Sequence, residues 1–188
     1  MSVLPIELWQ LILDFCPLQT QLALFQVNKF LHQRLQITDF YHISAKLKSK
    51  LTDQILKRYH HIKYLDAAWN GKITDEGIKH MQLHTLNATS SPFITDQGIK
   101  HMNLHTLDAS SNYRITDQGI KHMNLYSLSA FYNKMITDQG IGGKTTKHMY
   151  LHTLDASANR FITDQGIVSF CLPFALRLPF LSILIAQQ

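Results

Sequence analysis

The sequence predicts an α/β fold in which a repeat solenoid follows a short helical module, and three observations support this prediction. The triplet Ile-Thr-Asp recurs in three steps of 21 residues and one of 26, beginning at Ile73, Ile94, Ile115, Ile136 and Ile162. A segment with alternating apolar residues precedes each triplet, and x-Gly-Ile follows it. A period in this range indicates stacked repeats, because one unit cannot bury its apolar face alone.

The repeated unit has the form L-x-x-L-x-A-x-x-N-x-x-I-T-D-x-G-I-x-x-M. Its first part ends in period-two alternation, which predicts a short strand that pairs in parallel with its copies. The unit resembles the leucine-rich repeat signature, L-x-x-L-x-L-x-x-N-x-L, with Ala in the third core position. This resemblance implies parallel strands on a concave face and short helices on a convex face.

Two sets of polar residues are expected to satisfy the turns of each repeat. The ninth position of the unit is Asn70, Asn112, Asn133 and Asn159, with Ser91 as the exception. An Asn amide can bond backbone groups where the chain leaves a strand, so we expect a structural role there. The Thr or Asp of each triplet can cap a short helix, while the Ile and Met that follow supply its inner face.

The chain divides into three expected parts. Residues 1–45 form the helical module, residues 46–167 the solenoid, and residues 168–188 an apolar C-terminal cap or tail. Ile37-Thr38-Asp39 and Leu51-Thr52-Asp53 echo the repeated triplet, and we expect a degenerate first repeat from Leu51 onward. The 26-residue step contains an insertion at residues 142–146, which is expected on the helix side, where the sheet stays continuous.

The helical module carries a second resemblance. Its apolar residues follow a helical period that Pro17 interrupts, which predicts a few short helices. The pattern Leu4-Pro5-x-Glu7-Leu8, Ile12-Leu13, Leu22-x-Leu24 and Val27-x-Lys29 resembles the F-box, which binds the Skp-type adaptor of SCF ubiquitin ligases. The resemblance implies adaptor contacts at Leu4, Pro5, Ile12, Leu13, Leu22, Leu24 and Val27. A helical cap over the open end of the solenoid is the alternative.

The order of the two modules resembles that of F-box/leucine-rich-repeat proteins, the substrate receptors of SCF-type ligases. This resemblance implies a non-catalytic adaptor that links a bound substrate protein to a cullin-RING ubiquitin ligase. The alternative is a leucine-rich-repeat scaffold that binds partners without a ligase, tethered or not to a membrane by its C-terminal tail. No Ser/His/Asp or Cys/His arrangement has an interpretable spacing, so we expect no catalysis and no cofactor.

Alternation along the strands indicates which side chains a partner would meet. The outward positions are mainly hydroxyl-bearing and include the acids Asp66, Asp108 and Asp155, while aromatic residues lie at the strand ends. Because aromatic side chains often anchor protein interfaces, we expect partner contacts on and beside the concave face. The candidate residues are Trp69, Asp108, Tyr126, Phe131, Tyr132 and Asp155. Alternatively, the aromatic residues fill gaps between imperfect repeats.

Several other classes of site are not supported. Cys16 and Cys171 lack CxxC spacing, which argues against disulfides and zinc and favours a reducing, cytoplasmic location. Pairs such as His80 and His84 divide between a helix and the next strand, so copying of the repeat explains them better than metal binding. The net charge is +5, with the excess mainly at the module junction, and a solvated helix face is favoured over a nucleic-acid groove.

The segment 168–188 is strongly apolar and contains Pro173, Arg177 and Pro179. Its length approaches that of a membrane span. However, Arg177 in the centre would cost about 2.5 to 3.5 kcal/mol on insertion, and the prolines would interrupt a helix in lipid. We therefore expect an irregular cap over the last repeat and no membrane partner.

Overall fold

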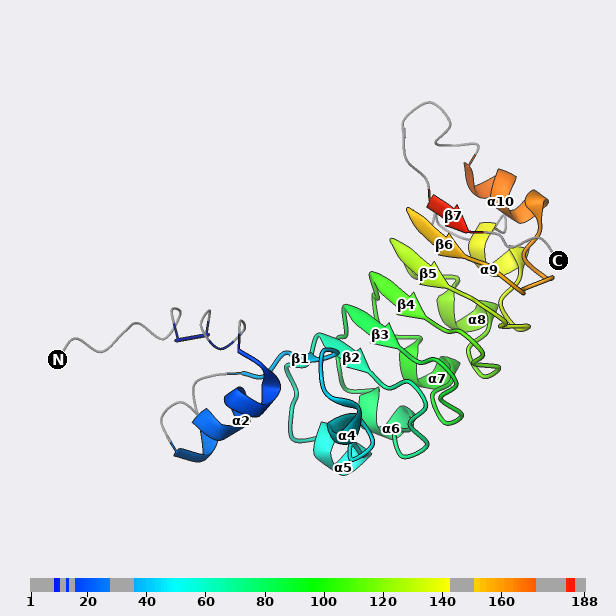
Figure 1. Ribbon diagram of the computed structural model, residues 1–188. Coiled ribbons are helices and arrows are strands. Elements are labelled where there is room, and N and C mark those ends of the chain that lie inside the picture. Colours follow the sequence, from blue (N-terminus) through cyan, green and yellow to red (C-terminus); the bar gives the residue numbers. More distant parts are fainter. Residues whose placement is uncertain are drawn as a thin grey trace.

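The computed structural model describes residues 9–10, 13, 16–27, 36–142, 151–171 and 182–184, with the backbone alone described for residues 25–27, 168–171 and 182–184. Seven strands form one parallel sheet in chain order (Figure 1). They are β1 (Asp39–Phe40), β2 (Tyr64–Asp66), β3 (Thr85–Asn87), β4 (Thr106–Asp108), β5 (Ser127–Ser129), β6 (Thr153–Asp155) and β7 (Ser182–Leu184). Each strand pairs in register with the next, so that Leu65 lies beside Leu86 and Leu86 beside Leu107.

Short helices alternate with the strands and lie along one side of the sheet (Figure 1). They are α4 (Ala45–Lys48), α5 (Asp53–Leu56), α6 (Asp75–Ile78), α7 (Asp96–Ile99), α8 (Asp117–Ile120), α9 (Asp138–Gly142) and α10 (Asp164–Cys171), and α2 (Leu18–Val27) precedes the sheet. The expected α/β leucine-rich-repeat solenoid is therefore confirmed.

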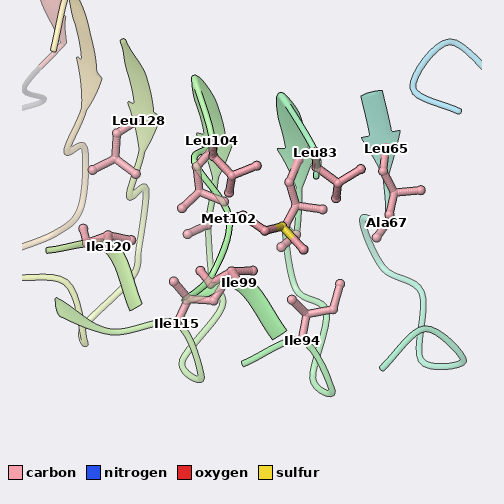
Figure 2. Packing of buried hydrophobic residues seen from close by; sticks show 14 of the residues in the cluster. Leu65, Ala67, Leu83, Ile94, Ile99, Met102, Leu104, Ile115, Ile120 and Leu128 are labelled. Atoms are coloured by element: carbon pink, nitrogen blue, oxygen red, sulfur yellow. The ribbon is translucent and has the colours of Figure 1, made fainter. Parts of the chain in front are cut away.

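The apolar positions of the repeat stack between the sheet and the helices (Figure 2). Leu104, Ile115 and Ile120, for example, are fully buried, and they come from the segment just before β4, the loop after β4 and helix α8. Full burial of one such side chain contributes roughly 1.5 to 3 kcal/mol. Because the same positions recur in each repeat, the described part of the solenoid has one continuous core, which includes residues from Leu18 to Ile167.

The Asn column closes the turn after each strand, as expected. Asn112 is 2% exposed, and its Nδ2 donates to the backbone carbonyls of Ala88, Ser91 and Ile94 in the preceding repeat. Its Oδ1 accepts from the backbone N–H groups of Arg114 and Ile115. One side chain thus satisfies five backbone groups and joins two repeats. At the exceptional Ser91, the hydroxyl donates only to the carbonyls of Ala67 and Thr89.

The Ile-Thr-Asp triplet forms a second link between repeats. The Thr hydroxyls cap α6, α7 and α8 by accepting a backbone N–H, as that of Thr95 does from Gln97. Each Asp accepts twice from the Thr of the next repeat: Asp96 Oδ1 from the Thr116 N–H at 2.8 Å, and Oδ2 from the Thr116 hydroxyl at 2.7 Å. The same pairs join Asp53 to Thr74, Asp75 to Thr95, Asp117 to Thr137 and Asp138 to Thr163.

The sheet begins earlier than the expected boundary at residue 46. β1 pairs with β2, so that Phe40 lies beside Leu65, and Ile37 and Phe40 are at most 3% exposed. Ile37-Thr38-Asp39 therefore leads into the first strand and is not a copy of the helix-capping triplet. That role falls to Leu51-Thr52-Asp53, because Thr52 caps α5 and Asp53 accepts from Thr74. The first repeat thus spans the expected boundary.

The C-terminal segment is more regular than the expected irregular cap. Residues 168–171 extend α10, and Ser182–Leu184 forms β7, which pairs in parallel with β6. Residues 172–181 and 185–188 lie outside the described residues, as do residues 143–146 of the insertion. In the described part of the chain, no helix has the length and apolar character needed to cross a membrane.

Candidate partner-binding surfaces

The side chains that leave the sheet away from the helices form what we call the concave face. Its acidic and amide side chains accept hydrogen bonds from the backbone just after their own strands. Asp108 Oδ1 accepts from the Ser110 N–H at 2.9 Å, and Asp155 Oδ1 accepts from the Ser157 N–H at 2.9 Å. Asn87 makes the same bond to Thr89. These bonds let a short polar side chain end the strand by mimicking a turn. The concave face is therefore polar and tightly tied to the backbone.

The N-terminal end of the concave face carries an ion pair. Lys48 of α4 contacts the Asp66 carboxylate, and both side chains are largely buried. Burial and the carboxylates of Asp66 and Asp108 raise the pKa of Tyr41. The first repeat thus neutralises one of the three acids and leaves the face hydroxyl-rich.

A line of flat side chains, which we call the ring column, borders the amino ends of the strands. It consists of Tyr64, His84, His105, Tyr126 and His152. His84 stacks on His105 with ring centroids 4.6 Å apart, and Tyr126 stacks on His105 at 4.7 Å and on His152 at 4.3 Å. The repeat spacing of the sheet, about 4.8 Å, brings equivalent rings to this distance. Burial, His105 and Lys63 lower the pKa of His84.

The opposite border of the sheet, which we call the loop rim, contains the five loops at residues 68–72, 89–93, 110–114, 131–135 and 157–161. It exposes most of the large apolar side chains that are exposed in the described residues: Trp69 (77%), Phe93 (51%), Tyr113 (45%), Phe131 (44%), Tyr132 (45%), Met135 (44%) and Phe161 (44%). A pocket of about 370 Å³ lies between two adjacent loops, and Phe93, Tyr113 and Arg114 contribute to its lining.

The backbone of the loop rim is left-handed at the residue before each ninth position. The φ angles are +58° at Trp69, +49° at Ser90, +51° at Ser111, +52° at Tyr132 and +56° at Ala158. A non-glycine residue is disfavoured there by roughly 1 to 2 kcal/mol. The Trp69 side chain is therefore not buried, and its backbone conformation is unfavourable. Packing in the core does not explain why a tryptophan occupies this position.

The structure divides the six predicted partner-binding residues among three surfaces. Trp69, Phe131 and Tyr132 lie together on the loop rim, and Asp108 and Asp155 lie on the concave face. Tyr126 belongs to the ring column, because it precedes β5 while Phe131 follows it. The exposure of Trp69, Phe131 and Tyr132 argues against the alternative that they fill gaps in the core.

Among the predicted adaptor contacts, Leu13 is 1% exposed and Leu22 and Leu24 are half-buried. Leu13 therefore occupies a core position and not a surface one. Val27 ends α2, and its side chain is not described, while Leu4, Pro5 and Ile12 lie outside the described residues.

Sequence reasoning missed Phe93, Tyr113, Met135 and Phe161, which complete the loop rim. All four lie between the ninth position and the Ile of the triplet, where the repeat has no core position. That offset is the signal that could have identified them. The sequence showed histidines that recur at one register, but the place of Tyr64 and Tyr126 among them was missed.

The in-register histidines do not gather at one centre. His80 contacts His60 with ring centroids 5.6 Å apart, whereas His84 stacks on His105, so His80 and His84 are separated as expected. Among the described residues, no three His, Cys, Asp or Glu side chains come together as a metal ion would require.

A protein-family model supports the repeat assignment. The leucine-rich repeat family model matches residues 60–81, which cover one repeat. Among solved structures, a chain in the crystal structure of the Rad7 and Elc1 complex from yeast is similar, with 13% sequence identity and a TM-score of 0.41. The match covers 73% of this chain and 45% of that chain, so this chain spans less than half the length of the yeast chain. No curated protein matches the sequence.

Proposed function

We propose that this chain is a non-catalytic adaptor whose repeats hold a substrate protein and whose helical module binds a Skp-type adaptor of a cullin-RING ubiquitin ligase. The observation that carries the proposal is the pairing of an F-box-like sequence pattern in residues 4–27 with a leucine-rich-repeat solenoid. A solenoid presents an extended surface on a rigid core, and such surfaces bind proteins. Its exposed aromatic loop rim has the residue types that anchor protein interfaces.

The module is firmly attached to the repeats, as a receptor that positions a substrate would need. Leu18 of α2 belongs to the same buried cluster as Ile37 and Phe40 of the first repeat. The side chain of Gln10 exchanges two hydrogen bonds with the backbone of Gln36, each 2.9 Å long. Gln21, 4% exposed, donates to the carbonyls of Leu13 and Cys16 and so fixes the turn before α2.

The same contacts favour a second candidate, an interaction scaffold in which the module only caps the solenoid. Leu18 covers the apolar end of the first repeat, which would otherwise face water. A cap and a docking element differ in one property: only the docking element binds an adaptor.

Capture of a purified Skp-type adaptor by the full chain separates the two candidates. The test variant carries Leu4→Ala, Pro5→Ala and Ile12→Ala, and the control carries Phe131→Ala and Tyr132→Ala on the loop rim. Circular dichroism checks that both remain folded. We expect the wild type and the control to capture the adaptor and the test variant to lose it. A wild-type chain that captures no adaptor would leave the scaffold as the function.

A further inference from the structure

The exposed apolar side chains of the loop rim form one ridge along the solenoid. All five loops contribute at least one aromatic side chain, and in chain order these are Trp69, Phe93, Tyr113, Phe131 with Tyr132, and Phe161. In the middle of the ridge, the rings of Tyr113 and Tyr132 from adjacent loops contact each other, with centroids 6.4 Å apart. A contiguous exposed apolar patch on a protein surface marks an interaction site more often than scattered apolar residues do.

The charge of the loop rim has a single sign. Its five loops contain the cations Lys72, Arg114, Lys134 and Arg160, all exposed, and no Asp or Glu. The acids of the adjoining strands, Asp66, Asp108 and Asp155, face the concave surface and bond their own backbone, and Asp66 also contacts Lys48. A ligand along the loop rim therefore meets apolar rings alternating with positive charges, which complements a segment with apolar and acidic side chains.

The dimensions of the loop rim suit a short extended peptide. Five loops span four strand spacings of about 4.8 Å, or roughly 19 Å, which an extended chain covers with about six residues. The pocket of about 370 Å³ beside Phe93, Tyr113 and Arg114 can admit one side chain of such a segment.

We infer that the loop rim binds an acidic, extended peptide segment of a partner protein, with its carboxylates on the rim cations and its apolar side chains on the rim aromatics. The inference rests on the proposed function, because it specifies the chemistry of the protein that the repeats hold. Arg114 and Lys134 lie in adjacent loops at the middle of the ridge and are the central charge contacts.

A single-stranded nucleic acid is the competing polyanion, and the structure favours it less. The rim rings contact one another edge-on or tilted, as in the pairs Tyr113 with Tyr132 and Phe131 with Tyr132, and Lys134 lies 5.4 Å from the Tyr132 ring centroid. Base binding needs open faces and a cation for each successive phosphate. Asp108 and Asp155 beside the rim would also repel a uniformly charged backbone, whereas a peptide can direct its acids to the rim alone.

Fluorescence anisotropy with a labelled peptide tests the inference on the full chain. The probe has about seven residues in which Glu alternates with Phe or Leu, and the comparison probes replace Glu by Lys or are oligothymidylate of similar length. We expect saturable binding of the Glu peptide that weakens with added salt. The inference is overturned if the Lys peptide or oligothymidylate binds as tightly as the Glu peptide, or if the Glu peptide does not bind.

Paired charge variants locate the contact. Arg114→Ala with Lys134→Ala removes two rim cations, and Lys100→Ala with Lys121→Ala removes two exposed cations that follow α7 and α8 on the helix side. The two variants have the same net charge. We expect the rim variant to weaken peptide binding about tenfold and the helix-side variant to leave it nearly unchanged. Equal weakening by both would indicate general charge attraction and overturn the assignment.

A separate variant tests the contacts between the rim aromatics and the apolar side chains of the peptide. Tyr113→Ser removes an exposed ring beside the pocket without touching the core, so the chain should stay folded. We expect peptide binding to fall about tenfold and the salt dependence to remain. Failure of the inference is distinct from failure of the proposed function. A chain that captures the Skp-type adaptor but does not bind the peptide would refute only peptide binding by the loop rim. A chain that binds the peptide but captures no adaptor would refute only the ligase role.

Discussion

At the scale of single residues, the glycine of the I-T-D-x-G motif is explained by the neighbouring repeat. A Cβ added to Gly98 would lie 2.3 Å from Asp75 Oδ1 and 3.2 Å from the Asp75 Cα. That carboxylate cannot move freely, because it accepts from the N–H and hydroxyl of Thr95. The motif is therefore a unit: Asp holds Thr of the next repeat, and Gly leaves room for Asp of the previous one.

We predict that Gly98→Ala lowers the free energy of unfolding by about 3 kcal/mol, because Asp75 must shift and lose its bonds to Thr95. Gly71→Ala is the matched control, since no atom lies within 4 Å of its added Cβ and its φ is not positive. It should leave stability unchanged or raise it by up to about 1 kcal/mol. Urea unfolding measures both variants, and similar losses in the two would contradict the role assigned to Gly98.

Trp69 allows a test of whether an exposed aromatic side chain contributes to folding. It is 77% exposed at a φ of +58°, where Asn is tolerated better than Trp. We predict that Trp69→Asn leaves the free energy of unfolding unchanged or raises it by up to about 1 kcal/mol. Thermal or urea unfolding gives the value. A loss above about 2 kcal/mol would show instead that the indole packs against the repeats.

At the scale of elements, the Asn column holds the loop of each repeat to the one before. We predict that Asn112→Ala lowers the free energy of unfolding by about 3 kcal/mol or more, because it leaves buried carbonyls and N–H groups without partners. Asn112→Ser should lose less, since a hydroxyl at this register reaches a carbonyl of an earlier repeat, as Ser91 reaches Ala67 at 2.6 Å. Denaturant midpoints compare the two; equal losses would refute the role assigned to the hydroxyl.

Two histidines, His84 of the ring column and His80 on the helix side, make stability depend on pH. Burial, His105 and Lys63 lower the pKa of His84, and burial, His60, Lys57 and Lys79 lower that of His80. Both imidazoles are thus kept neutral in the folded chain more than in the unfolded chain, whose His pKa is about 6.5. The contribution to stability is complete above that value and is lost as the pH falls through the lowered folded pKa.

We therefore predict that the free energy of unfolding decreases between about pH 7 and pH 5. His84→Gln should make this decrease smaller, because Gln does not titrate, while His80 keeps part of it. Urea unfolding at several pH values measures the slope for both chains. A slope that is unchanged or steeper in His84→Gln would contradict the predicted direction of the pH dependence.

At the scale of the whole molecule, the sequence predicted the features that recur in every repeat. It missed the features that depend on contacts between neighbouring repeats. The strands, the Thr caps, the Asn column and the core followed from one repeated unit, since each copy confirms the others. The start of the sheet was misplaced, because β1 places Phe40 beside Leu65, 25 residues later in the chain, and this spacing breaks the 21-residue period. The Asp-to-Thr bonds and the stacked rings link residues of different repeats, so no single copy of the unit shows them.

The surface was less predictable than the core for a related reason. Core positions are recognised by their apolar character, but an apolar residue at an outward position looks the same in sequence. Phe93 and Phe161 were therefore not recognised as rim residues, although each directly precedes the buried Ile of its triplet. Tyr126 was grouped with Phe131 as an aromatic residue on or beside the concave face, yet β5 separates them. Assigning surface residues needs the strand boundaries as well as the period.

Stacked repeats touch only their neighbours, so damage at one end should remain local. Leu18→Ala removes a 9%-exposed side chain from the cluster that joins α2 to the first repeat, and such losses cost about 2 to 5 kcal/mol. We predict faster hydrogen exchange at the Lys63 and Tyr64 amides, which donate to the Thr38 carbonyl at 2.8 and 3.1 Å. The Ala130 amide, which donates to the Asp155 backbone carbonyl at 2.8 Å, lies near the other end of the solenoid. It should exchange at its wild-type rate.

Residue-resolved hydrogen exchange of both chains under native conditions makes this comparison. The matched control is Leu128→Ala, which removes a buried leucine from β5 and should reverse the pattern, with the faster exchange near Ala130. Equal acceleration at both ends in Leu18→Ala would mean that the solenoid unfolds as one unit. A graded response would instead show that α2 stabilises mainly the repeat it covers, so that changes in the module leave the loop rim beyond its first loop at residues 68–72 in its native form.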